Sequence, residues 1–439
     1  MSTPTTGSST EASPTPPPED RPEEQTKHVP SGQGALLRQV ASSPAVVGLL
    51  AVLTALILSS ILILAADSEV RYTATYLLNR PGDFLHATAS TLSEAYSSLL
   101  RGAVFDWRAT TGVRMIRPIT DTLTNATPLI IAGLGMAVAF RAGLFNIGGQ
   151  GQMILGAITA CYVGIAWNLP PVAHLLVAVV GAALGGLVWG GIAGVLKART
   201  GANEVIVTIM LNSIAAHLLS QVLSLKAFNG EGETGNRKSL TVADTAQYPW
   251  LAGDSFRLHA GFLLALLVAV AVWWLMERSR LGFQLRATGL NADAARTAGM
   301  SVPWVTSLVM MISGALCGLA ATAPVLGTQK SMDESVVGTI GFDAITVALL
   351  GRSRPLGTVL AGLLFGALRA GGTAMQAAPG THIKIVLVLQ STIVLFIAAP
   401  PLIRAIFRLP ERRDTLGAAA PSPASVPAVA PAAPAAKEA

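Results

Sequence analysis

Apolar runs of about 17 to 25 residues recur along most of the chain, and each run has the length that an α-helix needs to cross a bilayer. Short polar segments separate the runs. The pattern predicts an all-α, polytopic integral membrane protein with about ten transmembrane helices, near residues 45–66, 126–140, 145–167, 172–196, 205–225, 259–276, 304–326, 336–350, 356–372 and 383–403.

The two ends of the chain have a different composition. Residues 1–43 are rich in Pro, Ser, Thr and Glu, and residues 409–439 are rich in Ala and Pro. Such segments bury too little apolar surface to order themselves, so both are predicted to be disordered tails of a membrane domain over 44–408. The first apolar run starts too far into the chain and is too long for a cleaved signal peptide, which favours a retained first helix.

The distribution of Arg and Lys predicts the orientation. Cytoplasmic loops of membrane proteins carry an excess of these residues. The rule assigns both termini to the cytoplasm, together with Arg38, Arg141, Lys197, Arg199, Arg278, Arg280, Arg286, Arg296, Arg352, Arg354 and the group from Arg404 to Arg413. Segments 67–125, 226–258, 327–335 and 373–382 then lie outside. Within the first of them, Asp83–Val104 has the spacing of an amphipathic helix, either at the membrane surface or packed on the loop.

Composition supports the membrane assignment. Hydrophobic residues make up 51% of the chain and charged residues 12%, about half the charged share of soluble domains. The formal net charge of +6 does not indicate a nucleic-acid partner, because the basic residues lie in short loops that can contact anionic lipid. Cys161 and Cys317 fall within apolar runs and are expected to be small buried hydrophobes. No cofactor or metal is predicted.

A polar, glycine-rich patch at Phe140–Ala157 interrupts the apolar pattern. Such a patch is tolerated at membrane depth only where it is buried in protein or lines a water-filled path. Its amides bring hydrogen-bonding groups without charge, which suits a path for a neutral polar solute. The alternative is that they bridge helices. Together with two asparagines of the next block, the candidate path residues are Asn146, Gln150, Gln152, Asn203 and Asn212.

The spans 126–140 and 336–350 are short for a full crossing. Short or interrupted spans in the two halves of a transporter indicate the region of the substrate path. Two carboxylates near membrane depth, Glu204 and Asp343, are expected to pair with a cation or to face water. The candidate cations are Arg141 or Lys197 for Glu204, and Arg352 or Arg354 for Asp343.

The chain contains no GxxxxGK[ST] phosphate-binding loop and too few intramembrane carboxylates for a clear proton relay. Uphill transport would therefore need an external motor. The segment Glu277–Val302 is the largest predicted cytoplasmic loop between helices, and Asn291 can cap a short helix within it. A rigid helix there could pass a neighbour's movement to the membrane helices; the alternative is an inert connector.

Four ordered blocks carry a resemblance to a known family. They are RAGLFNIG at 141–148 followed by GQM at 151–153, TGANEVIVTIMLNSIA at 200–215, the loop pattern formed by Gly282, Arg286, Ala287, Gly289, Ala294, Ala295 and Gly299, and GF at 341–342 followed by VALLG at 347–351. The chain resembles the permease subunits of bacterial nucleoside and simple-sugar ABC importers, in the superfamily of the ribose and branched-chain amino acid permeases. It departs from the family in its tails and at Gly149-Gln150, where a small residue and Glu are common.

The resemblance implies a multi-pass protein of a bacterial plasma membrane that moves a small polar solute inward and is not itself an enzyme. Its implied partners are a second permease chain (identical or paralogous), two cytoplasmic ATPase subunits, an extracytoplasmic substrate-binding protein that docks on 67–125 and 226–258, and membrane lipid, with no nucleic acid. The loop over 277–302 would be the ATPase coupling segment, with contact residues Arg286, Gly289, Ala294, Ala295, Arg296 and Gly299.

Two other classes of protein stay open at this point. The first is an ion-coupled secondary transporter or facilitator that works without an ATPase. The second is a membrane sensor or scaffold whose cytoplasmic tails carry the function.

Overall fold

The computed structural model describes residues 44–229 and 237–377, together with a few positions between 391 and 408. The predicted tails 1–43 and 409–439 and nearly all of the predicted span 383–403 lie outside the described residues. Residues Val47–Phe407 form one compact unit. In the described part the backbone is helical, and pairing between extended segments is limited to isolated bridges at Lys238–Asp333 and Trp250–His259.

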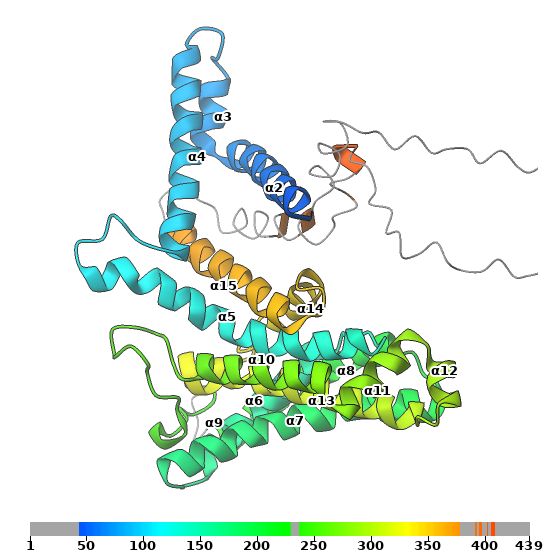
Figure 1. Ribbon diagram of the computed structural model, residues 1–439. Helices are drawn as coiled ribbons and strands as arrows, with labels where there is room; N and C mark the ends of the chain where they lie inside the picture. Colours follow the sequence, from blue (N-terminus) through cyan, green and yellow to red (C-terminus); the bar gives the residue numbers. More distant parts are fainter. Residues whose placement is uncertain are drawn as a thin grey trace, which may run out of the picture. The chain divides into compact units, whose positions relative to one another are not determined.

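The helices follow one another along the chain as Figure 1 shows. They are α2 (Pro44–Ala66), α3 (Ser68–Ala74), α4 (Pro81–Ala103), α5 (Gly112–Arg141), α6 (Gly149–Ala166), α7 (Pro171–Thr200), α8 (Glu204–Leu223), α9 (Lys226–Asn229), the 3₁₀-helix η1 (Asp244–Ala246), α10 (Gly261–Arg278), α11 (Arg280–Leu290), α12 (Ala292–Thr297), α13 (Val302–Ala320), the π-helix η2 (Ala323–Thr328), α14 (Ile340–Leu350) and α15 (Pro355–Ala377).

Local chemistry accounts for several helix boundaries. Proline occupies an early position of α4 and α7, where its missing N–H removes no hydrogen bond. Gly201 ends α7 in the left-handed conformation, with φ of 71°. Asn203 then caps α8 with its side chain. A three-residue connection, residues 201–203, therefore separates two long helices.

Six elements in the described residues are long and apolar enough to cross a membrane. They are α5, α7, α8, α10, α13 continued through η2, and α15. The pair α2 and α3, bent by 77°, makes a seventh if it is counted as one broken span. The structure therefore confirms an all-helical, multi-span protein. It does not confirm ten spans, since α6 opens with the polar sequence GQGQ and α14 has only 11 residues.

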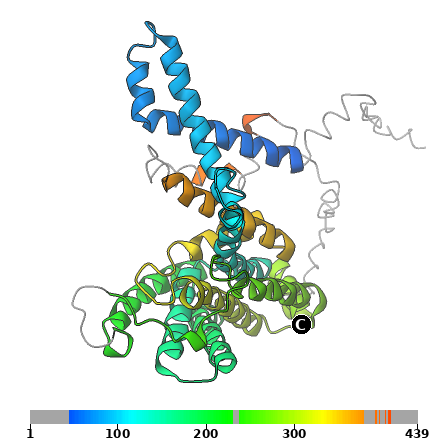
Figure 2. The ribbon, with the colours of Figure 1, turned by 90° about the vertical axis from the view of Figure 1, so that its left-hand side faces the viewer.

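Helices α5 and α13 form the centre of the bundle. The most apolar window of α5 is 83% buried and that of α13 with η2 is 72% buried, whereas α8 and α10 expose most of theirs. Helix α13 packs closely on α7 because glycines face one another there; a side chain at Gly186 would meet the backbone of Gly314. Helix α15 packs against α5. Helix α3 lies beside α4, as both views show (Figures 1 and 2).

Two predicted boundaries were wrong. The expected short span 126–140 is the second half of the 30-residue helix α5, whose first turns are polar because they contain Arg114, Arg117 and Asp121. The expected helix 145–167 begins only at Gly149, since residues 142–148 are not helical. The predicted span 336–350 is helical only over α14, which is too short to confirm a crossing, whereas the helix expected at Asp83–Val104 is confirmed as α4.

Candidate functional site

The polar patch predicted from the sequence forms a sharp turn between α5 and α6. Helix α5 ends at Arg141, and Gly143 takes a φ of 72°, which lets the chain reverse. We call residues 142–148 the α5–α6 turn. It places Asn146 in the centre of the bundle, where the side chain is fully buried.

Asn146 has hydrogen-bond partners on three sides. Its Nδ2 donates to Gln152 Oε1 at 2.9 Å and to Ser313 Oγ at 2.8 Å, and its Oδ1 accepts from the Gly148 amide at 2.9 Å. Gln152 Nε2 also donates to Asn146 Oδ1, at 3.1 Å. These bonds join the α5–α6 turn to α6 and α13, and they satisfy groups that would be costly to bury alone.

Asn212 extends the same network to α8. Its Oδ1 accepts from the Gly151 amide at 2.8 Å, and its Nδ2 donates to the Ile147 carbonyl at 2.9 Å. Asn146, Gln152 and Asn212 are thus brought together as one group, which we call the amide network. In this conformation the side-chain amides of the network form hydrogen bonds with one another, with Ser313 and with the backbone.

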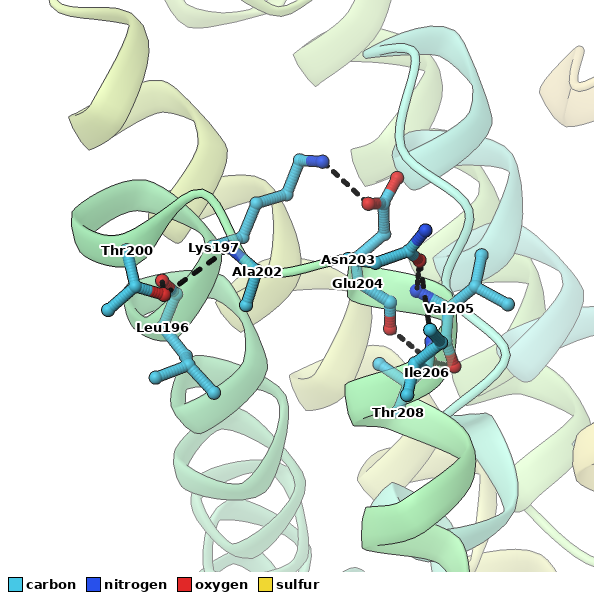
Figure 3. Close-up of polar contacts among 9 residues, drawn as sticks. All are labelled: Leu196, Lys197, Thr200, Ala202, Asn203, Glu204, Val205, Ile206 and Thr208. Carbon is cyan, nitrogen blue, oxygen red and sulfur yellow. Dashed lines mark hydrogen bonds and ion pairs between the residues drawn. The ribbon is translucent and has the colours of Figure 1, made fainter.

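Gln150 and Asn203 lie apart from the amide network. The half-buried Gln150 donates to the Gly338 carbonyl at 2.7 Å and accepts from the Gly341 amide at 3.1 Å, which ties α6 to the start of α14. Asn203 caps α8 by accepting from the amides of Val205 and Ile206 at 2.9 Å and 3.4 Å (Figure 3).

Both membrane-depth carboxylates have a cationic partner. Lys197, one of the two candidates for Glu204, donates to it at 2.5 Å (Figure 3). For Asp343 the expectation was wrong, because its partner is Arg369, at 2.5 Å, and not Arg352 or Arg354. Asp343 lies in the first turn of α14, whereas Arg352 and Arg354 follow the far end of that helix. Helix α15 returns beside α14 and so brings Arg369 to Asp343.

The predicted coupling segment folds as two short helices, α11 and α12, which lie beyond the end of α10 (Figure 1). Asn291 caps α12 as predicted, accepting from the amides of Asp293 and Ala294 at 3.0 Å and 2.9 Å. Ala294 and Arg296 are exposed, and Arg296 pairs with Asp293 at 2.9 Å. Ala295, in contrast, is 3% exposed and packs inside the chain.

The coupling segment contacts the α5–α6 turn directly. A Cβ on Gly289 would lie 2.5 Å from the Arg141 carbonyl oxygen, so only glycine permits this approach. Glu277 at the end of α10 accepts from Arg141 at 2.7 Å and lies 4.0 Å from Arg286. The sequence did not indicate that Glu277 joins the coupling segment to the end of α5. Movement of α11 would therefore reach the turn that carries Asn146.

Gly299, the last of the predicted coupling residues, follows α12 with a φ of 81°, and no other atom lies close to where its Cβ would be.

Comparison of the sequence with known proteins places this chain in a family. Residues 119–398 match the family described as the permease component of branched-chain amino acid transport systems. The chain belongs to this permease family. It is therefore a multi-pass membrane subunit of an ABC transporter, and not the ATPase subunit.

Several relatives of this permease have a named solute. The guanosine ABC transporter permease protein NupP of Bacillus subtilis is 40% identical over 65% of this chain and 82% of its own length. The glucose ABC transporter permease protein TsgB13 of Haloferax volcanii is 37% identical over 64% and 75%. The nucleoside ABC transporter permease protein NupB of Lactococcus lactis is 34% identical over 64% and 79%. The same three organisms each have a second, more distant permease that is 26–28% identical to this chain.

Proposed function

We propose that this permease imports a neutral polar solute of the nucleoside or simple-sugar class across a bacterial plasma membrane. The observation that carries the proposal is the identity of 34–40% to permeases named for guanosine, glucose and nucleosides. The buried amides at Asn146, Gln152 and Asn212 agree with it, because amides bond hydroxyl and carbonyl groups without selecting a charge.

The translocation path, in this proposal, passes the α5–α6 turn. Asn146, Gln152 and Asn212 bond to one another, to Ser313 or to the backbone in the present conformation. They would exchange these partners for solute groups when α6, α8 and α13 separate. Gln150 would follow the movement of α14, since it bonds both Gly338 and Gly341. Asn203 would sit at the mouth of the path, beside the Lys197–Glu204 pair.

The coupling segment supplies the proposed contact with the motor. Helix α12 presents the small side chain of Ala294 and the charged side chain of Arg296 on its exposed face. Two cytoplasmic ATPase subunits would bind these helices, one on each permease chain. The close contact of Gly289 with Arg141 would then transmit nucleotide-driven movement to the α5–α6 turn.

The proposed topology keeps both termini in the cytoplasm and counts ten spans. Residues 336–350, which include α14, would make one crossing, and α2, α6 and residues 383–403 would complete the set beside the six long elements. The ends that carry Arg141, Lys197 and Arg278 would face the cytoplasm, as the excess of basic residues there supports. An extracytoplasmic binding protein would deliver the solute to 67–125 and 226–258.

The proposed assembly contains two permease chains, two ATPase subunits and a binding protein. A paralogue is the proposed second permease, because three organisms with a relative of this chain also have a more distant one.

The test of the solute class is competition in proteoliposomes that contain the assembled transporter with its binding protein. Labelled guanosine and glucose are the probes. Uptake of one of them should be suppressed by unlabelled neutral nucleosides or sugars, and not by leucine. Uptake of branched-chain amino acids with no uptake of either probe would contradict the proposed class.

A further inference from the structure

A second polar site lies away from the amide network. A cavity of about 400 Å³ opens between α5, η2, residues 329–340 and α15. This volume falls in the range of about 300–1,000 Å³ that is usual for small-molecule sites. We call it the η2 cavity. Its wall combines apolar residues with hydroxyl and amide side chains, and the polar ones include Asn125, Thr328, Gln329, Ser335 and Thr339.

The backbone around the η2 cavity is interrupted. Helix α13 runs on into η2, a π-helix that is largely buried, and residues 329–339 then form no regular helix before the 11-residue helix α14. π-Helical turns are frequent at functional sites. Irregular backbone at membrane depth is tolerated where it lines a cavity, and broken helices mark the substrate site in many transporters. The interruption supplies Thr328, Gln329 and Ser335, which are all exposed.

The wall of the η2 cavity is close to electrically neutral. Arg369 is the only ionisable residue among those that line it in the described part of the chain. Its guanidinium donates to Asp343 at 2.5 Å and to Thr339 Oγ1 at 2.9 Å. An anion would have to displace Asp343 and a cation would meet Arg369, whereas a neutral solute with several hydroxyl or amide groups finds matching partners.

The η2 cavity is also connected to the rest of the transport machinery. Gly338 belongs to its wall, and its carbonyl accepts from Gln150 at 2.7 Å. Gly341 approaches Gln150 so closely that a Cβ on it would lie 2.5 Å from Gln150 Cα. Movement of α6 must therefore move the wall of the cavity.

We infer that the η2 cavity is a solute-binding station of this permease. It holds a neutral, hydroxyl-bearing solute against the side chains of Asn125, Gln329 and Thr339, and the Arg369–Asp343 pair excludes charged solutes. This inference rests on the proposed function for the choice of solute.

The first experiment uses thiol protection at Gln329. The side chain of Gln329 is exposed, whereas Cys161 and Cys317 are both buried. In the assembled transporter, Gln329→Cys should react with a small water-soluble thiol reagent, and guanosine or glucose, whichever is taken up, should slow the reaction at least about fivefold. Gln221→Cys, exposed on α8 away from the cavity, is the matched control and should be unaffected by solute. Equal reaction rates at position 329 with and without solute would overturn the inference.

Transport kinetics give an independent measurement. Gln329→Leu should raise the KM for uptake at least about tenfold, which corresponds to about 1.4 kcal/mol, and Gln221→Leu should leave it unchanged. An unchanged KM in Gln329→Leu would contradict a solute contact.

The charge pair is tested by a double exchange. Asp343→Asn leaves Arg369 uncompensated, so uptake of guanosine should fall while the ratio of guanosine 5′-monophosphate to guanosine uptake rises. The variant with both Asp343→Asn and Arg369→Gln restores a neutral wall. Its ratio of guanosine 5′-monophosphate to guanosine uptake should return to that of the wild type. An unchanged uptake ratio in the Asp343→Asn variant would show that the Arg369–Asp343 pair only supports the fold.

These outcomes separate the two proposals. If the wild-type transporter takes up neither guanosine nor glucose, the proposed solute class fails, and protection of Gln329→Cys by the solute that it does take up still tests the cavity. If uptake of guanosine or glucose is normal but gives no protection, the cavity inference fails alone.

Discussion

Asn146 shows how one polar residue acquires its environment from distant parts of the chain. The sequence indicated a polar group at membrane depth, which must be satisfied by protein or by water. Its partner Ser313 lies 167 residues further along, so no local pattern could have named it. Asp343 gives the same lesson, since the nearest cations in sequence are not its partners and Arg369 is. The burial of a polar side chain was predictable from the sequence, whereas its long-range pairing depended on the packed helices.

Replacing Asn146 by Leu should lower both uptake and stability. The change removes the Asn146 hydrogen bonds of Gln152, Ser313 and the Gly148 amide. Each buried polar group left unsatisfied lowers the stability by about 1–3 kcal/mol. Uptake and thermal unfolding of the purified complex are the measurements. The control for stability is Asn203→Leu, which removes an exposed helix cap and should cost about 1 kcal/mol of stability. Wild-type stability and uptake in Asn146→Leu would show that the amide network contributes nothing.

His259 provides a prediction about pH. Its ring is 1% exposed and stacks on Tyr248 with centroids 5.4 Å apart, and burial lowers the pKa of His259 to about 4. In the unfolded chain the pKa returns to about 6.5, so protons bind preferentially to the unfolded state between these values. Stability should therefore fall as the pH drops from about 6.5 towards 4, by up to about 3 kcal/mol.

The measurement is the unfolding temperature of the detergent-purified chain across that pH interval. His259→Phe keeps an aromatic ring against Tyr248 and removes the titrating group. Its unfolding temperature should depend less on pH than that of the wild type. Identical pH profiles for the two proteins would show that burial does not lower the pKa of His259.

At the scale of elements, apolar run length predicted where helices occur and failed where polar residues occupy a helical turn. Helix α5 starts 14 residues before the predicted span 126–140. The prediction missed these residues because the first turns carry charged side chains, and a search for apolar runs assigns such residues to a loop. Helix α12 of the coupling segment was predictable from Asn291, whose cap is a local interaction, whereas α11 was not predicted. The contact between Gly289 and Arg141 was not, since it depends on how α11 folds back on α5.

Helix α12 allows a sharp test of coupling, because Ala294 is exposed and its neighbour Ala295 is buried. Ala294→Glu should leave the chain folded and reduce ATP-driven uptake at least about tenfold, on the scale of 1.4 kcal/mol of lost coupling free energy. Ala166→Glu, at the exposed end of α6, is the matched control. Ala295→Glu should instead destabilise the chain itself. Normal uptake and normal ATPase binding in Ala294→Glu would exclude α12 as the motor contact.

At the scale of the whole molecule, four ordered sequence blocks pointed to the family, and the match over residues 119–398 confirms it. The long tails are features of this chain that the match does not include. The family membership makes the chain a transporter subunit, and the arrangement of α11, α12 and the α5–α6 turn gives a route by which a separate motor could act on it.

The measurement that tests the account most directly is uptake by proteoliposomes that contain this chain with and without its ATPase partner. Uptake of guanosine or glucose should require the partner and ATP, and the purified chain alone should hydrolyse no ATP. Uptake that proceeds without the ATPase, driven by a proton or sodium gradient, would contradict the account.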